Sequence, residues 1–245
     1  MSVFVIADLH LSTKDGMNKS MEIFGRRWES YTERLESAWR ALVTPDDTVV
    51  IPGDVSWGIS LEEAASDLHF IDSLPGRKIL GKGNHDFWWC TMKKHADFLE
   101  RENIRSIEFL FNNSYECEDF ILAGSRGWFP EEGLGVTNED VDFDKITARE
   151  LGRLRLSLED AAKRQRECGK EIIVFTHFPI VWNGKPNAPF VELLKEFSVR
   201  RVYFGHIHGA YATPSVIEYE GMQFYLCAAD YLCFVPKHIP AVPIP

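Results

Sequence analysis

The sequence of 245 residues has no apolar run that approaches the roughly 18 to 20 residues of a membrane-spanning helix. Its opening, MSVFVIADLH, lacks a basic flank and reaches the acidic Asp8 early, which is not typical of a secretory signal. The five cysteines include no C-x-x-C pair, so we expect reduced thiols rather than a disulfide framework. These absences exclude an integral membrane protein and predict a cytoplasmic protein with no membrane partner.

Positive charge is scarce as well. The chain has 27 Lys and Arg against 37 Asp and Glu, which gives a net charge of −10. This sign disfavours a protein that coats nucleic acid through a broad basic face. A small anionic substrate remains compatible, because a bound metal ion can reverse the sign locally. We therefore expect a small-molecule substrate and no nucleic-acid polymer as partner.

Linkers, internal repeats and low-complexity segments are also absent, so one domain over residues 1–235 is expected. The last ten residues hold four of the twelve prolines and cannot continue a helix or a central strand. Residues 236–245 are therefore predicted to form a Pro-rich C-terminal tail on the surface.

Short β-branched and aliphatic runs predict an α/β protein. Strands are expected at 3–7, 48–52, 78–80, 106–111, 120–123, 172–175, 202–204 and 224–227. Helical patterns cover about 20–42, 61–74, 87–102, 145–168 and 190–197. Alternation of strand and helix over the first hundred residues predicts βαβ units with parallel pairing. The closer strands of the later part indicate an added mixed or antiparallel portion.

Polar blocks follow five of these strands directly. They are Asp8-Leu9-His10, Gly53-Asp54, Gly83-Asn84-His85-Asp86, Thr176-His177, and Gly205-His206-Ile207-His208. Five of the eight histidines fall in these blocks. In open α/β sheets, ligands bind beyond the carboxyl ends of the strands, where these blocks would converge.

The side chains in these blocks offer carboxylate, imidazole and amide ligands but no thiolate, a set that suits Mn²⁺, Fe or Zn²⁺. The D-x-H and H-x-H spacings place alternate side chains on one side of an extended segment, so each pair can reach one centre. The candidates are too many for one tetrahedral ion and suit two divalent metal ions that share a ligand. The candidate ligands are Asp8, His10, Asp54, Asn84, His177, His206 and His208.

This ordered set resembles the signature of the calcineurin-like metallophosphoesterases, D-x-H, G-D, G-N-H-D/E, a lone His and G-H-x-H, between positions 8 and 208. The resemblance implies a four-layer αββα sandwich of two mixed β-sheets flanked by helices. It also implies hydrolysis of a phosphate mono- or diester by attack of a metal-bridging hydroxide, with a small phosphorylated substrate.

Carried over residue by residue, the resemblance divides the ligands between two ions. One ion would be held by Asp8, His10 and His208, and the other by Asn84, His177 and His206. Asp54 would bridge both ions and so take part in catalysis. His85 would face the substrate and protonate the leaving oxygen as a general acid.

Several alternatives remain at this point. The segment Gly53–Gly58 lacks the second Asp and the Arg of the protein-phosphatase pattern G-D-x-x-D-R-G, which weighs against a Ser/Thr protein phosphatase. A nucleotide phosphodiesterase and a non-catalytic metal-binding scaffold for protein interaction are the other hypotheses. Asp86 is interpreted as the N-cap of the helix predicted at 87–102. Trp57, Trp88, Trp89 and Trp182 either pack the loops or form a wall for substrate.

Overall fold

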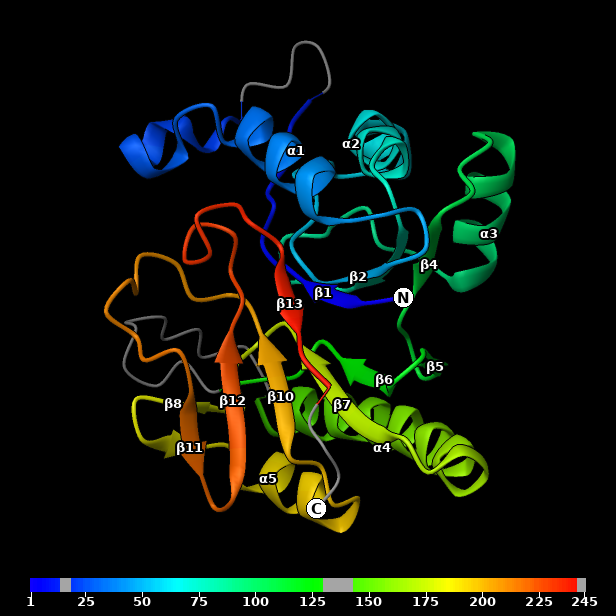
Figure 1. The fold of residues 1–245 in the computed structure, drawn as a ribbon, viewed down its shortest axis with the longest axis vertical. Coiled ribbons are helices and arrows are strands. Elements are labelled where there is room, and N and C mark those ends of the chain that lie inside the picture. Colours follow the sequence, from blue (N-terminus) through cyan, green and yellow to red (C-terminus); the bar gives the residue numbers. More distant parts are fainter. Residues whose placement is uncertain (14–18, 130–142, 242–245) are drawn as a thin grey trace.

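The computed structural model describes residues 1–13, 19–129 and 143–241, and its strands form two large sheets (Figure 1). The first sheet has the order β13-β1-β2-β3-β4. Its β1, β2, β3 and β4 pair in parallel, and β13 runs antiparallel along β1. These strands are β1 (Val3–Val5), β2 (Thr48–Pro52), β3 (Arg77–Gly81), β4 (Ile107–Phe109) and β13 (Lys237–Ile239).

The second sheet has the order β11-β12-β10-β7-β6-β5. The central strands β12, β10, β7 and β6 are parallel, whereas β11 and β5 are antiparallel edges. A short hairpin of β8 (Val181–Trp182) and β9 (Lys185–Pro186) follows β7. The strands of the second sheet are β5 (Ser114–Glu116), β6 (Phe120–Ser125), β7 (Glu171–Thr176), β10 (Arg201–Phe204), β11 (Ile217–Tyr219) and β12 (Met222–Leu226).

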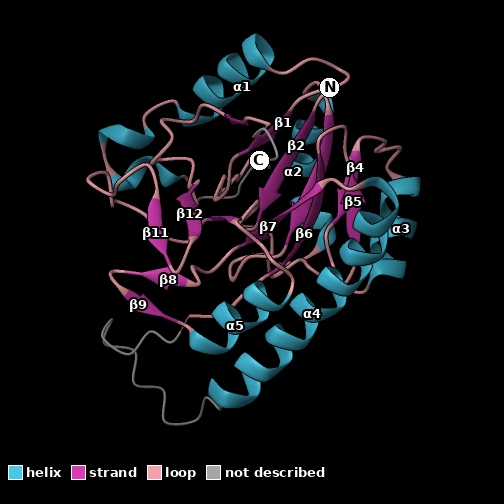
Figure 2. Ribbon diagram, turned by 60° about the horizontal axis from the view of Figure 1, so that its bottom comes forward, coloured by secondary structure: helices cyan, strands magenta, loops and turns pink. Residues whose placement is uncertain are grey.

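The helices divide between the two sheets. Figure 1 shows α1, α2 and α3 against the first sheet, and Figure 2 shows α4 and α5 side by side against the second. Two 3₁₀ turns, Met21–Phe24 and Arg26–Trp28, precede α1. The helices are α1 (Tyr31–Leu42), α2 (Leu61–Ser73), α3 (Met92–Arg101), α4 (Phe143–Cys168) and α5 (Ala188–Glu196).

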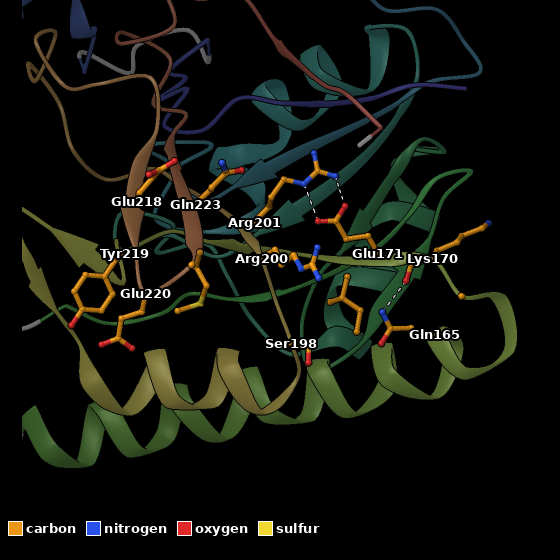
Figure 3. A pocket seen from close by; sticks show the side chains of 14 residues that line it. Gln165, Lys170, Glu171, Ser198, Arg200, Arg201, Glu218, Tyr219, Glu220 and Gln223 are labelled. Atoms are coloured by element: carbon orange, nitrogen blue, oxygen red, sulfur yellow. Dashed lines mark hydrogen bonds and ion pairs between the residues drawn. The ribbon is translucent and has the colours of Figure 1, made fainter. Parts of the chain in front are cut away.

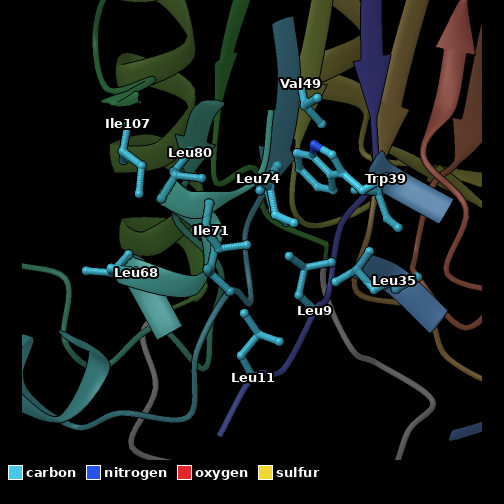
Figure 4. Packing of buried hydrophobic residues seen from close by; sticks show 14 of the residues in the cluster. Leu9, Leu11, Leu35, Trp39, Val49, Leu68, Ile71, Leu74, Leu80 and Ile107 are labelled. Carbon is cyan, nitrogen blue, oxygen red and sulfur yellow. The ribbon is translucent and has the colours of Figure 1, made fainter. Parts of the chain in front are cut away.

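Alternation along the strands separates three apolar layers. In β2, Val49 and Ile51 face α1 and α2, while Val50 faces the second sheet. Figure 4 shows Leu35 and Trp39 in the layer that also holds Val49. Ile172 and Val174 of β7 pack in the layer that contains α4 and α5, while Ile173 and Phe175 pack between the sheets. These layers make the αββα sandwich, so the predicted fold class is confirmed.

Two predicted helices differ from those observed. The segment predicted at 20–42 is interrupted at Gly25, which has a φ of 104°, and α1 begins only after Ser30, which has a φ of 46°. The helix predicted from residue 87 begins at Met92, after the N-cap Thr91, whose side chain accepts a hydrogen bond from the Lys94 N–H. In both cases the apolar pattern is continuous, but the backbone turns before the helix starts.

The prediction of a surface tail is wrong for Lys237–Ile239, which form β13 along β1. Proline at 236 and 240 flanks this strand, as is tolerated at a sheet edge that uses only one side of its hydrogen-bonding ladder. Residues 242–245 lie outside the described part of the chain, so the domain limits stay a prediction. Within the described residues, no helix has the length and apolar character needed to cross a membrane.

Candidate metal centre

The polar blocks of both sheets meet at one end of the sandwich. Asp8 follows β1 and Asp54 follows β2 in the first sheet, whereas His177 follows β7 and His206 follows β10 in the second. The sheets are joined there by the His206 backbone N–H, which donates to the Asp8 carboxylate at 2.9 Å. The strand ends therefore converge as the sequence predicts.

Asp8, His10 and His208 form the first group of candidate ligands. One potential ligand atom from each lies within 4.8 Å of the others. The Nε2 atoms of His10 and His208 are 3.1 Å apart, although His10 is buried and His208 reaches the surface. This group coincides with the set that the resemblance assigns to one ion.

A second group gathers around the side-chain oxygen of Asn84. His177 Nε2 is 2.6 Å from Asn84 Oδ1, and His206 Nδ1 is 3.0 Å from the same atom. These are the residues that the resemblance assigns to the other ion. The structure thus brings together an amide oxygen from the first sheet and two imidazoles from the second.

Asp54 lies between the two groups. Its Oδ2 is 3.7 Å from His10 Nε2 and 3.4 Å from His177 Nε2. Asp8, Asp54 and His177 also form a compact set of potential ligands, with ligand atoms within 4.8 Å of one another. The position of Asp54 is therefore the one that a shared ligand would occupy.

Burial makes this cluster unfavourable without a cation. It raises the pKa of Asp8 to about 7 and that of Asp54 well above its ordinary value, because charged carboxylates lose hydration. It lowers the pKa of His177 well below the ordinary value and that of His206 to about 4. His10 Nδ1 is buried without a hydrogen-bond partner in the described structure. A cluster of buried lone-pair donors fits divalent cations of the Mn²⁺, Fe or Zn²⁺ type.

Asp86 holds the loops that carry the ligands of the first sheet. Its buried carboxylate accepts hydrogen bonds from the backbone N–H groups of Gly83, Asp54 and Val55 at 2.7, 2.8 and 2.9 Å. The Trp88 indole N–H also donates to it, at 3.0 Å. The predicted role as a helix N-cap is wrong, because Asp86 points back to the β2 and β3 loops and Thr91 caps α3.

Asp230 supports His208 of the second sheet. Its Oδ1 is 3.0 Å from His208 Nδ1, and its Oδ2 accepts the Gly209 N–H at 3.0 Å. Burial opposes a charge on His208, but the hydrogen bond with Asp230 and the negative charges of Asp8 and Asp230 together outweigh this effect and raise the pKa of His208. The contact leaves His208 Nε2 facing His10 and fixes the imidazole as a potential ligand. Sequence reasoning missed Asp230, although it too lies just beyond a predicted strand, at 224–227.

His85 lies beside the cluster and in neither group of candidate ligands found among the described residues. Its backbone N–H donates to Asp54 Oδ1 at 2.8 Å, and its half-buried ring is centred 5.6 Å from that of His10. Burial lowers the pKa of His85. His85 is thus close to the candidate ligands without belonging to either group, and its place next to the substrate and its role stay predictions.

The tryptophans resolve into two kinds. Trp57 stacks on His10 with ring centroids 4.8 Å apart and contacts His85 at 4.6 Å. It occupies the position of the second Asp in the protein-phosphatase pattern. Trp88 is buried and bonded to Asp86, and Trp89 packs on Phe109. Trp182 packs against Phe204, so Trp57 is distinguished from these three by its ring contacts with the candidate ligand His10 and with His85.

The backbone of the site is unusual. Asp8, His10, Asp54 and His206 have positive φ angles of 59°, 46°, 52° and 68°. Asn, Asp and His tolerate this left-handed region better than other side chains. A Cβ on Gly83 would collide with the Asp54 carboxylate, and one on Gly205 would collide with the Asp8 carboxylate. Close approach therefore requires these glycines, in addition to the sharp turn expected from the sequence.

A cavity of about 740 Å³ lies elsewhere, at the amino ends of β7, β10 and β12 (Figure 3). Its main charged groups are paired, since Arg201 binds the Glu171 carboxylate through Nε at 2.9 Å and through Nη2. The groups of potential metal ligands in the described residues lie at the opposite ends of these strands. We therefore assign the candidate site to the carboxyl ends.

Comparisons with known proteins identify the family of this chain. The model of the family described as calcineurin-like phosphoesterase matches residues 1–210. Gene 66 protein of Mycobacterium phage L5 is 40% identical over 82 residues, which are 33% of this chain and 37% of the phage protein. The match thus spans little more than a third of that relative.

Three solved structures are similar to this chain at low identity. A crystal structure 12% identical aligns over 91% of this chain and 89% of its own, with a TM-score of 0.52. The protein of unknown function AQ665 from Aquifex aeolicus is 17% identical, with 97% and 95% of the two chains covered and a TM-score of 0.44. The protein TT1561 of Thermus thermophilus is 9% identical, with 98% of each chain covered and a TM-score of 0.48. At 12% identity, the first of these likenesses concerns the fold alone.

Proposed function

Because this chain belongs to the calcineurin-like phosphoesterase family, we propose that it is a dinuclear-metal-dependent hydrolase of small phosphate mono- or diesters. The observation that carries the proposal is the position of Asp54 Oδ2, 3.7 Å from a histidine of one ligand group and 3.4 Å from a histidine of the other. A single carboxylate between two sets of ligands is what a pair of ions would require.

The residues would divide as their positions suggest. Asp8, His10 and His208 would hold one ion, Asn84, His177 and His206 the other, and Asp54 both. Two such ions would neutralise phosphoryl charge and lower the pKa of bound water towards about 7. We propose Mn²⁺, Fe or Zn²⁺ as the ions.

The remaining side chains would prepare the site for the reaction. The His85 imidazole would donate a proton to the leaving oxygen, a contribution of about 10²–10⁴-fold in rate. Trp57 would limit the rotation of that imidazole and keep water from one side of it. Asp86 and Asp230 would keep the ligands in place through the hydrogen bonds described above.

The alternatives concern substrate and activity. A nucleotide phosphodiesterase would use the same centre, whereas a binding scaffold would need none of its chemistry. The presence of all seven candidate ligands around one point supports hydrolysis. The cytoplasmic location is also part of the proposal and is supported by the five free cysteines.

The test is to reconstitute the chelated protein with Mn²⁺ and measure metal content together with hydrolysis of p-nitrophenyl phosphate and bis-p-nitrophenyl phosphate. We expect two ions per chain and hydrolysis of at least one ester. Asp54→Asn should reduce the occupancy of both ions, whereas Asp97→Asn, a surface change in the Lys93 ion pair, should not. Saturation at one ion would contradict the dinuclear centre. Full loading without hydrolysis of these esters or of a nucleotide panel would favour the scaffold.

A further inference from the structure

A cluster of four basic side chains lies beside the metal centre. Arg126, Arg149 and Arg153 all contact Oε1 of Glu150, at 3.3, 3.4 and 2.6 Å. Lys82 lines the same small cleft as Arg126 and Arg153. We call Lys82, Arg126, Arg149 and Arg153 the basic cluster.

The strand order places the basic cluster next to the candidate ligands. Lys82 follows β3, two residues before Asn84. Arg126 follows β6, the neighbour of β7, and His177 comes directly after β7. The Arg126 carbonyl accepts the His177 backbone N–H at 3.1 Å. A substrate held at the ligands therefore has the basic cluster on one flank.

Among the described residues, the positive charges of the basic cluster outnumber the carboxylates that pair with them. Three arginines contact one fully buried carboxylate, Glu150, in a protein whose net charge is −10. In the part of the chain that the structure describes, Lys82 forms no ion pair. The side chains of Arg126 and Arg153 are 15% and 30% exposed, so part of each is reached by solvent, and Arg126 Nε is buried without a hydrogen-bond partner among the described residues.

The cleft also restrains these groups. The Arg153 guanidinium lies 5.1 Å above the Phe111 ring, and that of Arg126 lies 5.5 Å from the Trp128 ring. Stacking on aromatic faces holds the planar groups in place and leaves their edges for oxygen acceptors. An anion such as a phosphate or carboxylate can then be bound by two donors at once.

We propose that the basic cluster binds a second anionic group of the substrate, so that the enzyme selects phosphate esters that carry another phosphate or carboxylate. The inference rests on the proposed function, because the first phosphate must lie at the metal centre. Glu150 holds the arginines in the absence of substrate, and the incoming anion supplies the negative charge that the cluster lacks.

Matched substrates test this selectivity. Phosphate release is measured with Mn²⁺-loaded enzyme on α,ω-alkanediol bisphosphates of two to six carbons and on the corresponding alkyl monophosphates. We expect kcat/KM for the best bisphosphate to exceed that for its monophosphate by about tenfold or more, beyond the factor of two for its two ends. Lys82→Met and Arg153→Met should remove most of this ratio. Arg155→Met, on the same helix but paired with Glu196 at the surface, should keep it.

A second measurement needs no hydrolysis. Binding of pyrophosphate to the metal-free protein is followed by calorimetry and should weaken about tenfold in Lys82→Met and Arg153→Met but not in Arg155→Met. Equal bisphosphate and monophosphate rates in an active enzyme would overturn the inference and leave the proposed function standing. If pyrophosphate binding to the metal-free protein weakens as expected in the variants but the Mn²⁺-loaded enzyme hydrolyses no ester, the proposed function is overturned instead. Weakened pyrophosphate binding without a change in the ratio would show an independent anion site and also contradict the inference.

Discussion

The two sheets contribute to the metal centre in different ways. The first sheet supplies all the candidate oxygen ligands, from Asp8, Asp54 and Asn84, whereas the second supplies imidazoles only. Asp86 supports the first half through the backbone of its loops, and Asp230 supports the second through the side chain of His208. Loss of the first support should therefore disturb the fold, whereas loss of the second should disturb metal affinity.

The largest effect is expected for Asp86→Ala. Four backbone N–H groups and the Trp88 indole would lose a buried acceptor. We expect the free energy of unfolding, measured by urea denaturation of the metal-free protein, to fall by about 3–5 kcal/mol in total. Asp97→Ala at the surface is the control. If the variant is as stable as the control, the loops after β2 and β3 do not depend on Asp86 for their conformation.

His85→Ala should act on turnover alone, since His85 lies outside both ligand groups. We expect metal content and thermal midpoint to be kept while kcat falls about 10²-fold. The fall should be smaller for nitrophenyl esters than for alkyl esters, because nitrophenolate needs no proton to leave. If the variant loses an ion, or if both kinds of ester suffer equally, His85 is not the general acid.

Asp230→Ala should weaken the metal site with little effect on stability. Removal of a carboxylate that orients a metal-binding histidine reduces metal affinity by about 10–100-fold. Mn²⁺ titration of the metal-free protein measures this, and Asp230→Asn should recover part of it, since its amide oxygen can still accept from His208. If the Mn²⁺ affinity is unchanged in both variants, His208 is not a metal ligand.

The helix layers differ in acid sensitivity, because α3 carries the buried His95, whereas α4 and α5 contain no histidine. Burial lowers the pKa of His95 to about 4. Between pH 6.5 and 4 the unfolded chain therefore binds one proton that the folded chain does not, and the free energy of unfolding decreases as the pH is lowered. Between pH 7 and 5.5 this amounts to about 1 kcal/mol. His95→Gln keeps an acceptor for the Cys90 N–H, 3.2 Å from His95 Nε2, without titrating. The free energy of unfolding of this variant, measured by urea denaturation, should change by that much less between pH 7 and 5.5. If the free energies of variant and wild type change in parallel with pH, His95 is not the group responsible.

The sequence predicted the central strands well because their apolar runs are buried on both faces. β2 was predicted with its observed limits, and the central strands of both large sheets follow from such runs. Among the strands that were not predicted, β5, β11 and β13 are three-residue edges with weaker patterns, and β8 and β9 form a separate hairpin of two residues each. Their pairing partners, rather than their own composition, define them.

The candidate site divides in the same way. The seven ligands and His85 carry a recognisable order along the chain, and the structure brings them to one end of the sandwich. The support from Asp230 depends on a contact between residues 22 positions apart, which no local pattern reveals. The place of Asp86 was misjudged because an acidic residue before an apparent helix predicts a cap equally well.

The left-handed backbone at four of the candidate ligands changes how an inactive form of this protein should be made. Alanine at Asp8, His10, Asp54 or His206 would remove a donor and also place an unsuited residue at positive φ, at a cost of about 1–2 kcal/mol. A loss of activity could then come either from the missing metal ligand or from a displaced loop, and the two causes could not be separated. Asparagine and glycine accept the same backbone geometry. Asparagine, the nearest neutral relative of an aspartate ligand, is thus also a residue that leaves the loop conformation undisturbed. A lineage that lost the activity would be expected to acquire such substitutions first.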